Sequence, residues 1–190
     1  MANANVSNGK QQGSQIPHFT DVATLRSQAR KNVEDGAVTV SYGADREKVI
    51  ALLNGALATE IVCVLRYKHH YFTADGLASD SVKAEFLEHA QEEQDHADKI
   101  AERIVQLGGN PDLNPATLLA RSHSEYVEGK SLKEMIKEDL IAERIAIESY
   151  TEIIRYLEDK DPTSHKLMRE ILAKEEEHAE DMSSLMRDHK

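Results

Sequence analysis

The sequence predicts an all-α protein whose main part is a four-helix bundle, made of two antiparallel helical hairpins joined by a long crossover. Four long segments place apolar residues three and four positions apart, which is the helical period. Turn-forming residues are scarce, because the 190 residues include only 9 Gly and 4 Pro. Links of about five residues within each pair of helices force antiparallel neighbours, whereas roughly twenty residues between the pairs can run the length of a bundle.

Residues 1–45 are predicted to form an N-terminal extension, first disordered and then a short helix. Asn, Gln, Ser and Gly dominate residues 1–17, which leaves almost nothing to bury. An amphipathic segment over 21–34 follows, with apolar side chains at helical spacing: Val22, Leu25, Ala29 and Val33. The stretch EDGAVTVSYGAD is predicted to connect this segment to the bundle, which spans 46–190.

The first hairpin is predicted to consist of a helix over about 46–74 and a second that begins within SDSVKAEF. Asp45 is the expected N-cap of the first helix. The second helix ends where Gly108 and Gly109 are followed by Pro111, a strong stop signal. The apolar stripe of the first helix contains Leu53, Leu57, Ile61, Val64 and Leu65.

The second hairpin carries equally clear start signals. Ser131 and Glu134 match a capping box, in which the two residues satisfy free backbone N–H groups at the helix start. Asp161 is a candidate N-cap for the last helix, with Pro162 at the first helical position, where its missing N–H costs nothing. The sequence therefore predicts helices that begin near residues 132 and 162.

Composition and charge exclude several classes of function. Asp and Glu number 34 against 23 Lys and Arg, giving a net charge of −11, so the basic surface that binds a nucleic-acid duplex is not expected. The single Cys63 rules out an intramolecular disulfide and fits a reducing compartment. No run of about 18 apolar residues predicts a membrane span, and the polar N-terminus does not resemble a secretory signal. A cytoplasmic location is therefore expected, with no membrane partner.

Four glutamates interrupt the apolar stripes of the four helices, one in each. Glu60, for example, has Leu57 and Val64 as neighbours on its helix face. Burying a carboxylate without compensation is expensive, so four inward carboxylates need a shared positive partner. The four residues are Glu60, Glu93, Glu143 and Glu175.

Two histidines complete a repeated pattern. His96 and His178 each follow a glutamate by three residues, which puts both side chains on one helix face. Glu93 follows Glu60 by 33 residues and Glu175 follows Glu143 by 32, so each hairpin supplies the same set. Two divalent cations would bring four positive charges to four carboxylates. The pattern predicts a di-metal site, and carboxylates with one imidazole per metal favour iron or manganese over structural zinc.

Four stretches resemble bacterioferritin, a ferritin-like di-iron carboxylate family, over about residues 46–188: LLNGALATEIVCVLRYKHHYF, HAQEEQDHADKIAERI, MIKEDLIAE and ILAKEEEHAEDM. The resemblance implies two iron ions per chain bridged by Glu93 and Glu175. It further implies that Glu60 and His96 complete one coordination sphere, and Glu143 and His178 the other. Tyr67 matches a tyrosine that lies beside the site in this family and can supply an electron.

Departures from the family pattern change two expectations. Gln94 stands where bacterioferritin has a methionine that ligates haem, so no haem is predicted. The chain stops soon after the fourth helix, where bacterioferritin adds a short fifth helix. A homo-oligomer is expected, and a shell of 24 or 12 chains and a dimer all stay open.

The expected function is that of a ferroxidase, which oxidises Fe(II) with O2 or H2O2 for iron storage, detoxification and protection from oxidative stress. The enzymatic alternative uses the same ligands, with manganese, as a catalase-like or rubrerythrin-like peroxidase that stores no metal. A non-enzymatic alternative is a structural or DNA-condensing shell, which predicts a basic tail that the sequence lacks. His89, one turn before Glu93, is open between a hydrogen bond to a ligand and a position at the rim of the site.

Overall fold

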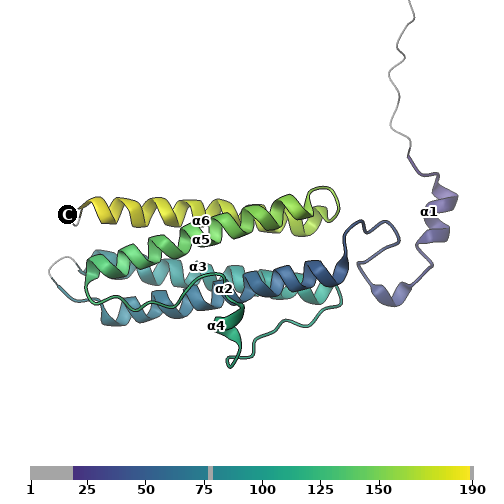
Figure 1. Cartoon of the computed structure of the whole chain (residues 1–190). Coiled ribbons are helices and arrows are strands. Elements are labelled where there is room, and N and C mark those ends of the chain that lie inside the picture. Colours follow the sequence, from purple (N-terminus) through teal and green to yellow (C-terminus); the bar gives the residue numbers. More distant parts are fainter. Residues whose placement is uncertain (1–18, 77–78, 189–190) are drawn as a thin grey trace, which may run out of the picture.

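The computed structural model describes residues 19–76 and 79–188, so the predicted disorder of residues 1–17 lies outside the described residues. Four long helices lie side by side (Figure 1): α2 (Arg46–Thr73), α3 (Ser79–Gln106), α5 (Leu132–Leu157) and α6 (Pro162–Asp188). The described ranges contain helices and no strand. The predicted all-α fold of two hairpins and a long crossover is confirmed, with α2 packed on α3 and α5 packed on α6.

The predicted helix starts are confirmed. Each start is fixed by a nearby side chain that accepts a hydrogen bond from a free backbone N–H. Asp45 accepts a hydrogen bond from the Lys48 N–H at 3.2 Å and caps α2. Ser131 accepts from the Glu134 N–H at 3.3 Å and caps α5. The Glu134 carboxylate accepts from the Lys130 N–H at 2.8 Å, one residue before the position that a capping box predicts.

The predicted start of the last helix and the predicted end of the first hairpin are also confirmed. Asp161 accepts a hydrogen bond from the Ser164 N–H at 2.9 Å, and Pro162 is the first residue of α6. Gly108, just beyond α3, has a φ of 76°, the left-handed conformation that favours glycine at a helix end. Gly109 lets the chain pass close to α2, since a Cβ there would lie 2.8 Å from the Ile50 Cγ2 atom.

The interior between the four long helices contains two main apolar clusters along the bundle axis, and a third, small cluster lies under the crossover. The larger cluster includes Leu53 and Leu57 of α2, and the smaller one includes Phe86 of α3 and Met182 of α6. On every long helix the residues of one cluster are separated from those of the other by the positions where the sequence places an inward glutamate. A polar layer therefore lies between two apolar layers, near the middle of the bundle.

The crossover between α3 and α5 contains a short helix, α4 (Leu118–Arg121), that the sequence did not predict. Leu118 packs on Ala58 and Val62 of α2, and the His123 N–H donates to the Thr59 hydroxyl at 2.9 Å. The predicted stripe of α2 is wrong at Leu65, which is 49% exposed. The crossover covers a different strip of α2, so Leu65 is left at the surface.

The N-terminal extension has less helix than predicted. The segment expected over 21–34 forms α1 (Val22–Gln28) and a separate 3-10 turn, η1 (Val33–Asp35). Neither element contains a buried residue, and Val22, Leu25 and Val33 are exposed. The apolar spacing predicted the helix, but α1 lies apart from the bundle in Figure 1, so that its stripe is not covered within this chain.

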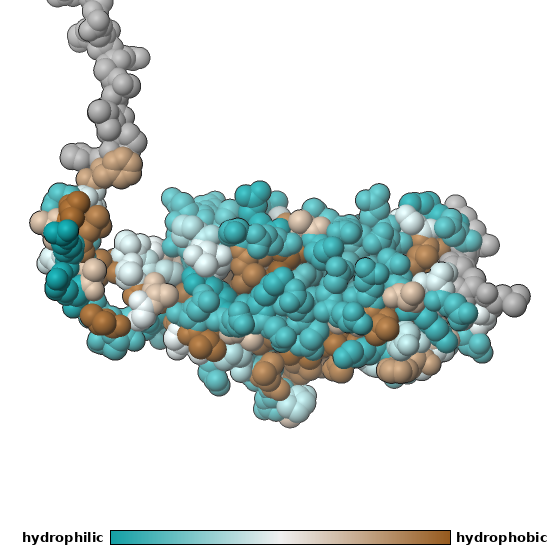
Figure 2. Space-filling view, turned by 180° about the vertical axis from the view of Figure 1, so that it is seen from behind, coloured by the Kyte–Doolittle hydropathy of each residue, from teal (hydrophilic) through white to brown (hydrophobic). Residues whose placement is uncertain are grey.

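The surface of the bundle is largely hydrophilic on the face turned away from the viewer in Figure 1, with small apolar patches between charged side chains (Figure 2). By length and composition alone, α2 is apolar enough to cross a membrane. In the bundle 56% of its most apolar window is buried, as in the core helix of a packed domain.

Candidate metal centre

The polar layer consists of six side chains that the four long helices direct inward. Each long helix contributes a glutamate, and α3 and α6 each add a histidine one turn later. None of the six is more than 6% exposed. The structure thus brings together every residue of the predicted di-metal set: Glu60, Glu93, His96, Glu143, Glu175 and His178.

The potential ligand atoms form two sets, each within 4.8 Å, and both sets include Glu93 and Glu175. The first set adds Glu60 and His96, and the second adds Glu143 and His178. His96 Nδ1 lies 3.2 Å from a Glu60 oxygen and 3.0 Å from a Glu175 oxygen. His178 Nδ1 lies 3.5 Å from a Glu93 oxygen and 3.6 Å from a Glu175 oxygen. Two metal positions with two shared carboxylates fit this arrangement.

Buried polar atoms without partners indicate that this layer is built to hold cations. Within the described residues, both carboxylate oxygens of Glu93, both of Glu175 and one of Glu143 are buried and accept no hydrogen bond, and His178 Nδ1 has no partner either. Buried polar atoms are almost always hydrogen-bonded in folded proteins. Carboxylate oxygens and an imidazole lone pair are the donors that iron and manganese take, so the residues present fit a pair of such ions.

Protons are held in this layer in the absence of metal. Burial and the charge of Glu93 raise the pKa of Glu60 to about 8, and the same two causes raise the pKa of Glu143 well above its usual range. Burial alone would lower the pKa of His96, but its contacts with Glu175 and Glu60 raise it to about 12. A metal ion that binds these groups must displace their protons.

A glutamate outside the six holds one of the histidines in place. The Glu92 carboxylate lies 2.7 Å from His178 Nε2, so the other ring nitrogen, Nδ1, faces the site. Lys174 pairs with the second Glu92 oxygen at 3.2 Å. Carboxylates bound to the outer nitrogen of a histidine commonly orient it toward a metal.

Two tyrosines connect the two hairpins at the site through hydrogen bonds. The Tyr67 hydroxyl of α2 donates to Glu143 of α5 at 2.5 Å, and the Tyr150 hydroxyl of α5 donates to Glu60 of α2 through a short hydrogen bond. Tyr67 was predicted to lie beside the site, and it does. Tyr150 was missed as a site residue, although it follows Glu143 by seven residues just as Tyr67 follows Glu60.

His89 lies inside the bundle and not at its rim. Its side chain is 2% exposed, and its ring stacks on that of His178 with centroids 3.9 Å apart. His89 Nδ1 lies 3.2 Å from the Tyr67 hydroxyl. His89 therefore contacts one predicted ligand and the predicted tyrosine.

A second buried polar group lies one turn of α5 before Glu143. Arg66 Nε and His70 Nδ1 each lie 2.8 Å from an oxygen of Asp139, and all three side chains are fully buried. Sequence reasoning did not identify this group. Its members are neighbours in space and come from two hairpins, so only the packing of α2 on α5 brings them together.

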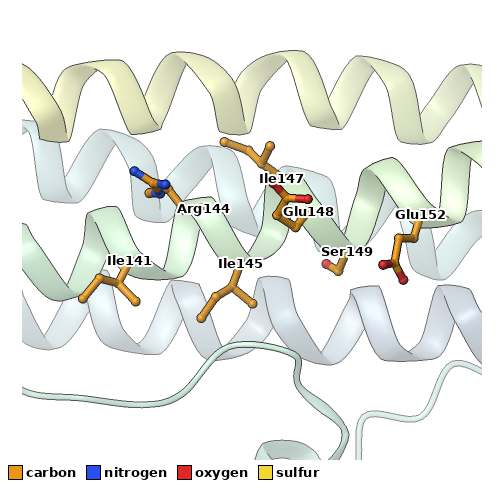
Figure 3. Close-up of a pocket in the computed structure, with 7 residues that line it drawn as sticks. All are labelled: Ile141, Arg144, Ile145, Ile147, Glu148, Ser149 and Glu152. Atoms are coloured by element: carbon orange, nitrogen blue, oxygen red, sulfur yellow. The ribbon is translucent and has the colours of Figure 1, made fainter.

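Two of the surface openings differ in how they relate to the ligand set. A pocket of about 170 Å³ beside His96 is lined by residues of α3 and α6, among them Glu92 and Lys174. A broader groove runs along α5, where Ile141 and Ile145 point to the same side (Figure 3). His96 is the one predicted ligand that lines the first opening, and none of the six lines the second.

Comparison of this chain with known proteins shows which family it is similar to. A family model described as a ferritin-like domain matches residues 50–190. The chain is similar to the DNA protection during starvation protein of Pyrococcus furiosus, at 35% identity over 140 residues, which cover 72% of this chain and 75% of that protein. It is also similar to the bacterioferritin of Brucella melitensis, at 35% identity over 133 residues, which cover 69% and 78%.

A solved structure extends the likeness to three dimensions. The dodecameric thioferritin of Bacteroides fragilis, described as a bacterioferritin-related protein, superposes with a TM-score of 0.74 at 32% identity. The superposition covers 77% of this chain and 88% of that chain. The family match runs from α2 to α6 and so includes all six buried residues of the polar layer.

Proposed function

Because the chain belongs to the ferritin-like family, we propose that it is a ferroxidase that oxidises Fe(II) at a dinuclear centre within each subunit. One observation carries the proposal: four carboxylates and two imidazoles are buried together, and several of their oxygens, as well as His178 Nδ1, have no hydrogen-bond partner. A buried set of this kind needs about two divalent cations to compensate its charge.

The ligand roles follow from which side chains are shared. Glu93 and Glu175 would hold both ions, since both belong to each set of ligand atoms. Glu60 and His96 would complete the ligands of one ion, and Glu143 and His178 those of the other. Gln94 offers no sulfur ligand, so haem forms no part of the proposal.

Fe(II) is the substrate of the proposed reaction. Each of two ions gives up one electron, and the pair reduces H2O2 with two protons to two water molecules, or O2 with two protons to H2O2. The protein holds both ions close together and leaves coordination positions open to the oxidant. Tyr67, hydrogen-bonded to the ligand Glu143, is placed to supply one electron in place of a second Fe(II), so that the oxidant still receives two electrons.

Storage and protection depend on assembly, and we propose a homo-oligomeric shell. The similar protein of Bacteroides fragilis is described as dodecameric, which favours twelve chains over 24 or two. The exposed Ile141 and the adjacent groove on α5 offer an apolar contact surface (Figure 3). The exposed apolar side chains of α1 support packing of the described part of the extension, residues 19–45, on a neighbouring subunit. Light scattering of the purified protein measures this assembly.

The charge of the chain bears on how such a shell would protect a cell. One similar protein is named for DNA protection, but the net charge of −11 here disfavours direct binding to a duplex. We therefore propose protection through removal of Fe(II) and oxidant in the cytoplasm, without nucleic acid or membrane as partner.

A di-manganese peroxidase is the second candidate, because the same donor set suits manganese as well as iron. In that case the centre would turn over H2O2 repeatedly and no iron would be stored. The choice of metal separates the two candidates, and both use the same six ligands.

Rapid-mixing absorbance tests the proposal. Metal-free protein receives two Fe(II) per chain, then O2 or H2O2, and the rate of Fe(III) formation is compared with buffer. We expect fast oxidation that is lost in Glu93→Ala and kept in Glu102→Ala, a control at an exposed position of the same helix. Oxidation no faster than in buffer would overturn the ferroxidase proposal, and peroxide turnover by the manganese-loaded protein would then favour the second candidate.

A further inference from the structure

Three side chains outside the dinuclear set converge between α3 and α6. His89 Nε2 lies 3.5 Å from a Glu85 oxygen and 3.6 Å from an Asp181 oxygen, and these ligand atoms all lie within 4.8 Å of one another. None of the three belongs to either set of the dinuclear centre. On α3, His89 lies about one turn and Glu85 about two turns before Glu93, and on α6 Asp181 lies about one turn beyond His178.

The hydrogen bonds of His89 fix which of its ring nitrogens faces this group. The Tyr67 hydroxyl donates its proton to Glu143, so the Tyr67 oxygen accepts from His89 Nδ1–H at 3.2 Å. In the neutral imidazole the other nitrogen, Nε2, then carries a lone pair. That lone pair faces two carboxylates. Three acceptors directed at one point are stabilised by a cation placed between them.

The separations suit a metal ion. Bonds of about 2.0 to 2.2 Å to nitrogen and oxygen place neighbouring ligand atoms roughly 3 to 3.5 Å apart around one ion. Burial and the charge of Asp181 raise the pKa of Glu85 above its usual range, as expected for like charges held close together.

The burial of the three side chains differs in a way that also suits an exchangeable ion. His89 is 2% exposed, whereas the side chains of Glu85 and Asp181 are 34% and 42% exposed. An ion anchored on His89 would therefore keep part of its coordination sphere open to water.

We propose that Glu85, His89 and Asp181 form a third divalent-cation site that takes ions of the same class as the dinuclear centre, Fe(II), Mn(II) or Co(II). It contacts that centre through the stacked ring of His178 and through Tyr67. The proposal concerns binding by residues outside the dinuclear set, and it holds whether or not that set oxidises iron.

Equilibrium titration of the metal-free full-length protein with Co(II), followed by visible absorbance and calorimetry, counts the ions. We expect three Co(II) per chain, with the third bound more weakly because two of its ligands are exposed. The double variant Glu85→Gln, Asp181→Asn should bind two, with the affinities of those two unchanged. The matched control Glu102→Gln, Glu170→Gln removes the same charge from exposed positions of the same two helices and should bind three.

Each other outcome is decisive. Two ions in the unchanged protein, a third ion that persists in the double variant, or a third ion lost equally in the control would overturn the third site. Fewer than two ions in the unchanged protein would instead overturn the dinuclear centre on which the proposed function rests. Anomalous diffraction from Co(II)-soaked crystals provides a second readout, with a peak at His89 Nε2 expected and a third ion found only elsewhere contradicting the proposal.

Discussion

Arg103 and Asp161 form a buried ion pair of 2.9 Å at the end of the bundle where α3 stops and α6 starts, whereas the candidate metal centre gathers four carboxylates around two imidazoles. The ion pair is satisfied by its own neighbours, since Ser164 accepts from Arg103 Nε at 2.8 Å and donates to Asp161 at 2.7 Å. Tyr42 also donates to Asp161, at 2.9 Å. The metal centre leaves several buried oxygens without a partner.

The two clusters differ in whether their buried polar atoms find partners within the chain, and this difference distinguishes a structural polar cluster from a binding site. A buried charge that the chain compensates by itself holds elements together and needs nothing from outside. A buried charge that the chain leaves uncompensated needs a ligand. In the cluster of Arg66, Asp139 and His70 the charge of Asp139 is compensated, with a guanidinium on one oxygen and an imidazole on the other, although His70 Nε2 is buried without a hydrogen-bond partner.

The largest expected effect falls on the compensated cluster. Arg103→Met removes the positive partner and leaves Asp161 buried with its charge unpaired, which should lower the free energy of unfolding by about 3 to 5 kcal/mol. The number of Co(II) ions bound should not change. Denaturant unfolding and a metal titration on the same sample check both parts. A variant that binds fewer Co(II) ions but keeps its stability would contradict the structural role given to this ion pair.

Metal should stabilise the protein through the uncompensated cluster, and Glu93→Ala should abolish that effect. At a free metal concentration one hundred times the dissociation constant, binding should add about 2.7 kcal/mol to the free energy of unfolding. Without metal the variant should be less stable than the unchanged protein, because it removes a buried carboxylate that lies 3.5 Å from His178 Nδ1 and 3.6 Å from His96 Nδ1. Thermal unfolding with and without Mn(II) measures both; equal metal-induced shifts in the two proteins would contradict this role for Glu93.

The two tyrosines test whether the hairpins contribute equally to the site. Tyr150→Phe removes the hydrogen bond to Glu60 and Tyr67→Phe removes the one to Glu143. Each loss should cost about 1.5 kcal/mol of stability in the metal-loaded protein, as for a hydrogen bond to a charged group. Oxidation should be slowed more by Tyr67→Phe, because Tyr67 is the residue proposed to supply an electron. Equal rates in both variants would argue for a purely structural role.

The pH dependence should separate the two clusters as well. In the metal-free protein Glu60, with a pKa of about 8, holds a proton below that pH, and a metal ion must displace it. Metal affinity should therefore rise between about pH 6 and about pH 8, by about tenfold per unit for each proton displaced. Metal titrations at several pH values measure the slope, and a flat profile would show that Glu60 is not protonated there.

The ion pair should not titrate in that range. Burial alone would raise the pKa of Asp161, but hydrogen bonds from Ser164 lower it below its usual value, so the carboxylate stays charged. The stability contributed by this group is present above the pKa that Asp161 has in the unfolded chain and is lost only as the pH falls through its lower folded value. Unfolding of the metal-free Glu60→Gln variant, in which the main group that titrates near pH 8 is absent, isolates this behaviour.

By itself the sequence determined the features that depend on near neighbours in the chain. Asp45, Ser131 and Asp161 cap their helices through residues three positions away, so the starts of three helices were predictable. The inward direction of the four glutamates followed from the helical period, because a residue between two apolar neighbours on one face must share their environment. Short and long links then fixed the two hairpins and the crossover.

Only the tertiary structure decided which side chains from different helices meet. Tyr150 reaches Glu60 across 90 residues, and His89 stacks on His178, because α2 faces α5 and α3 faces α6 in one register. The burial of His89 and the exposure of Leu65 depend on the same packing. A helical pattern gives the face of a residue but not the partner opposite that face, since the partner is set by the rotation and sliding of whole helices against one another.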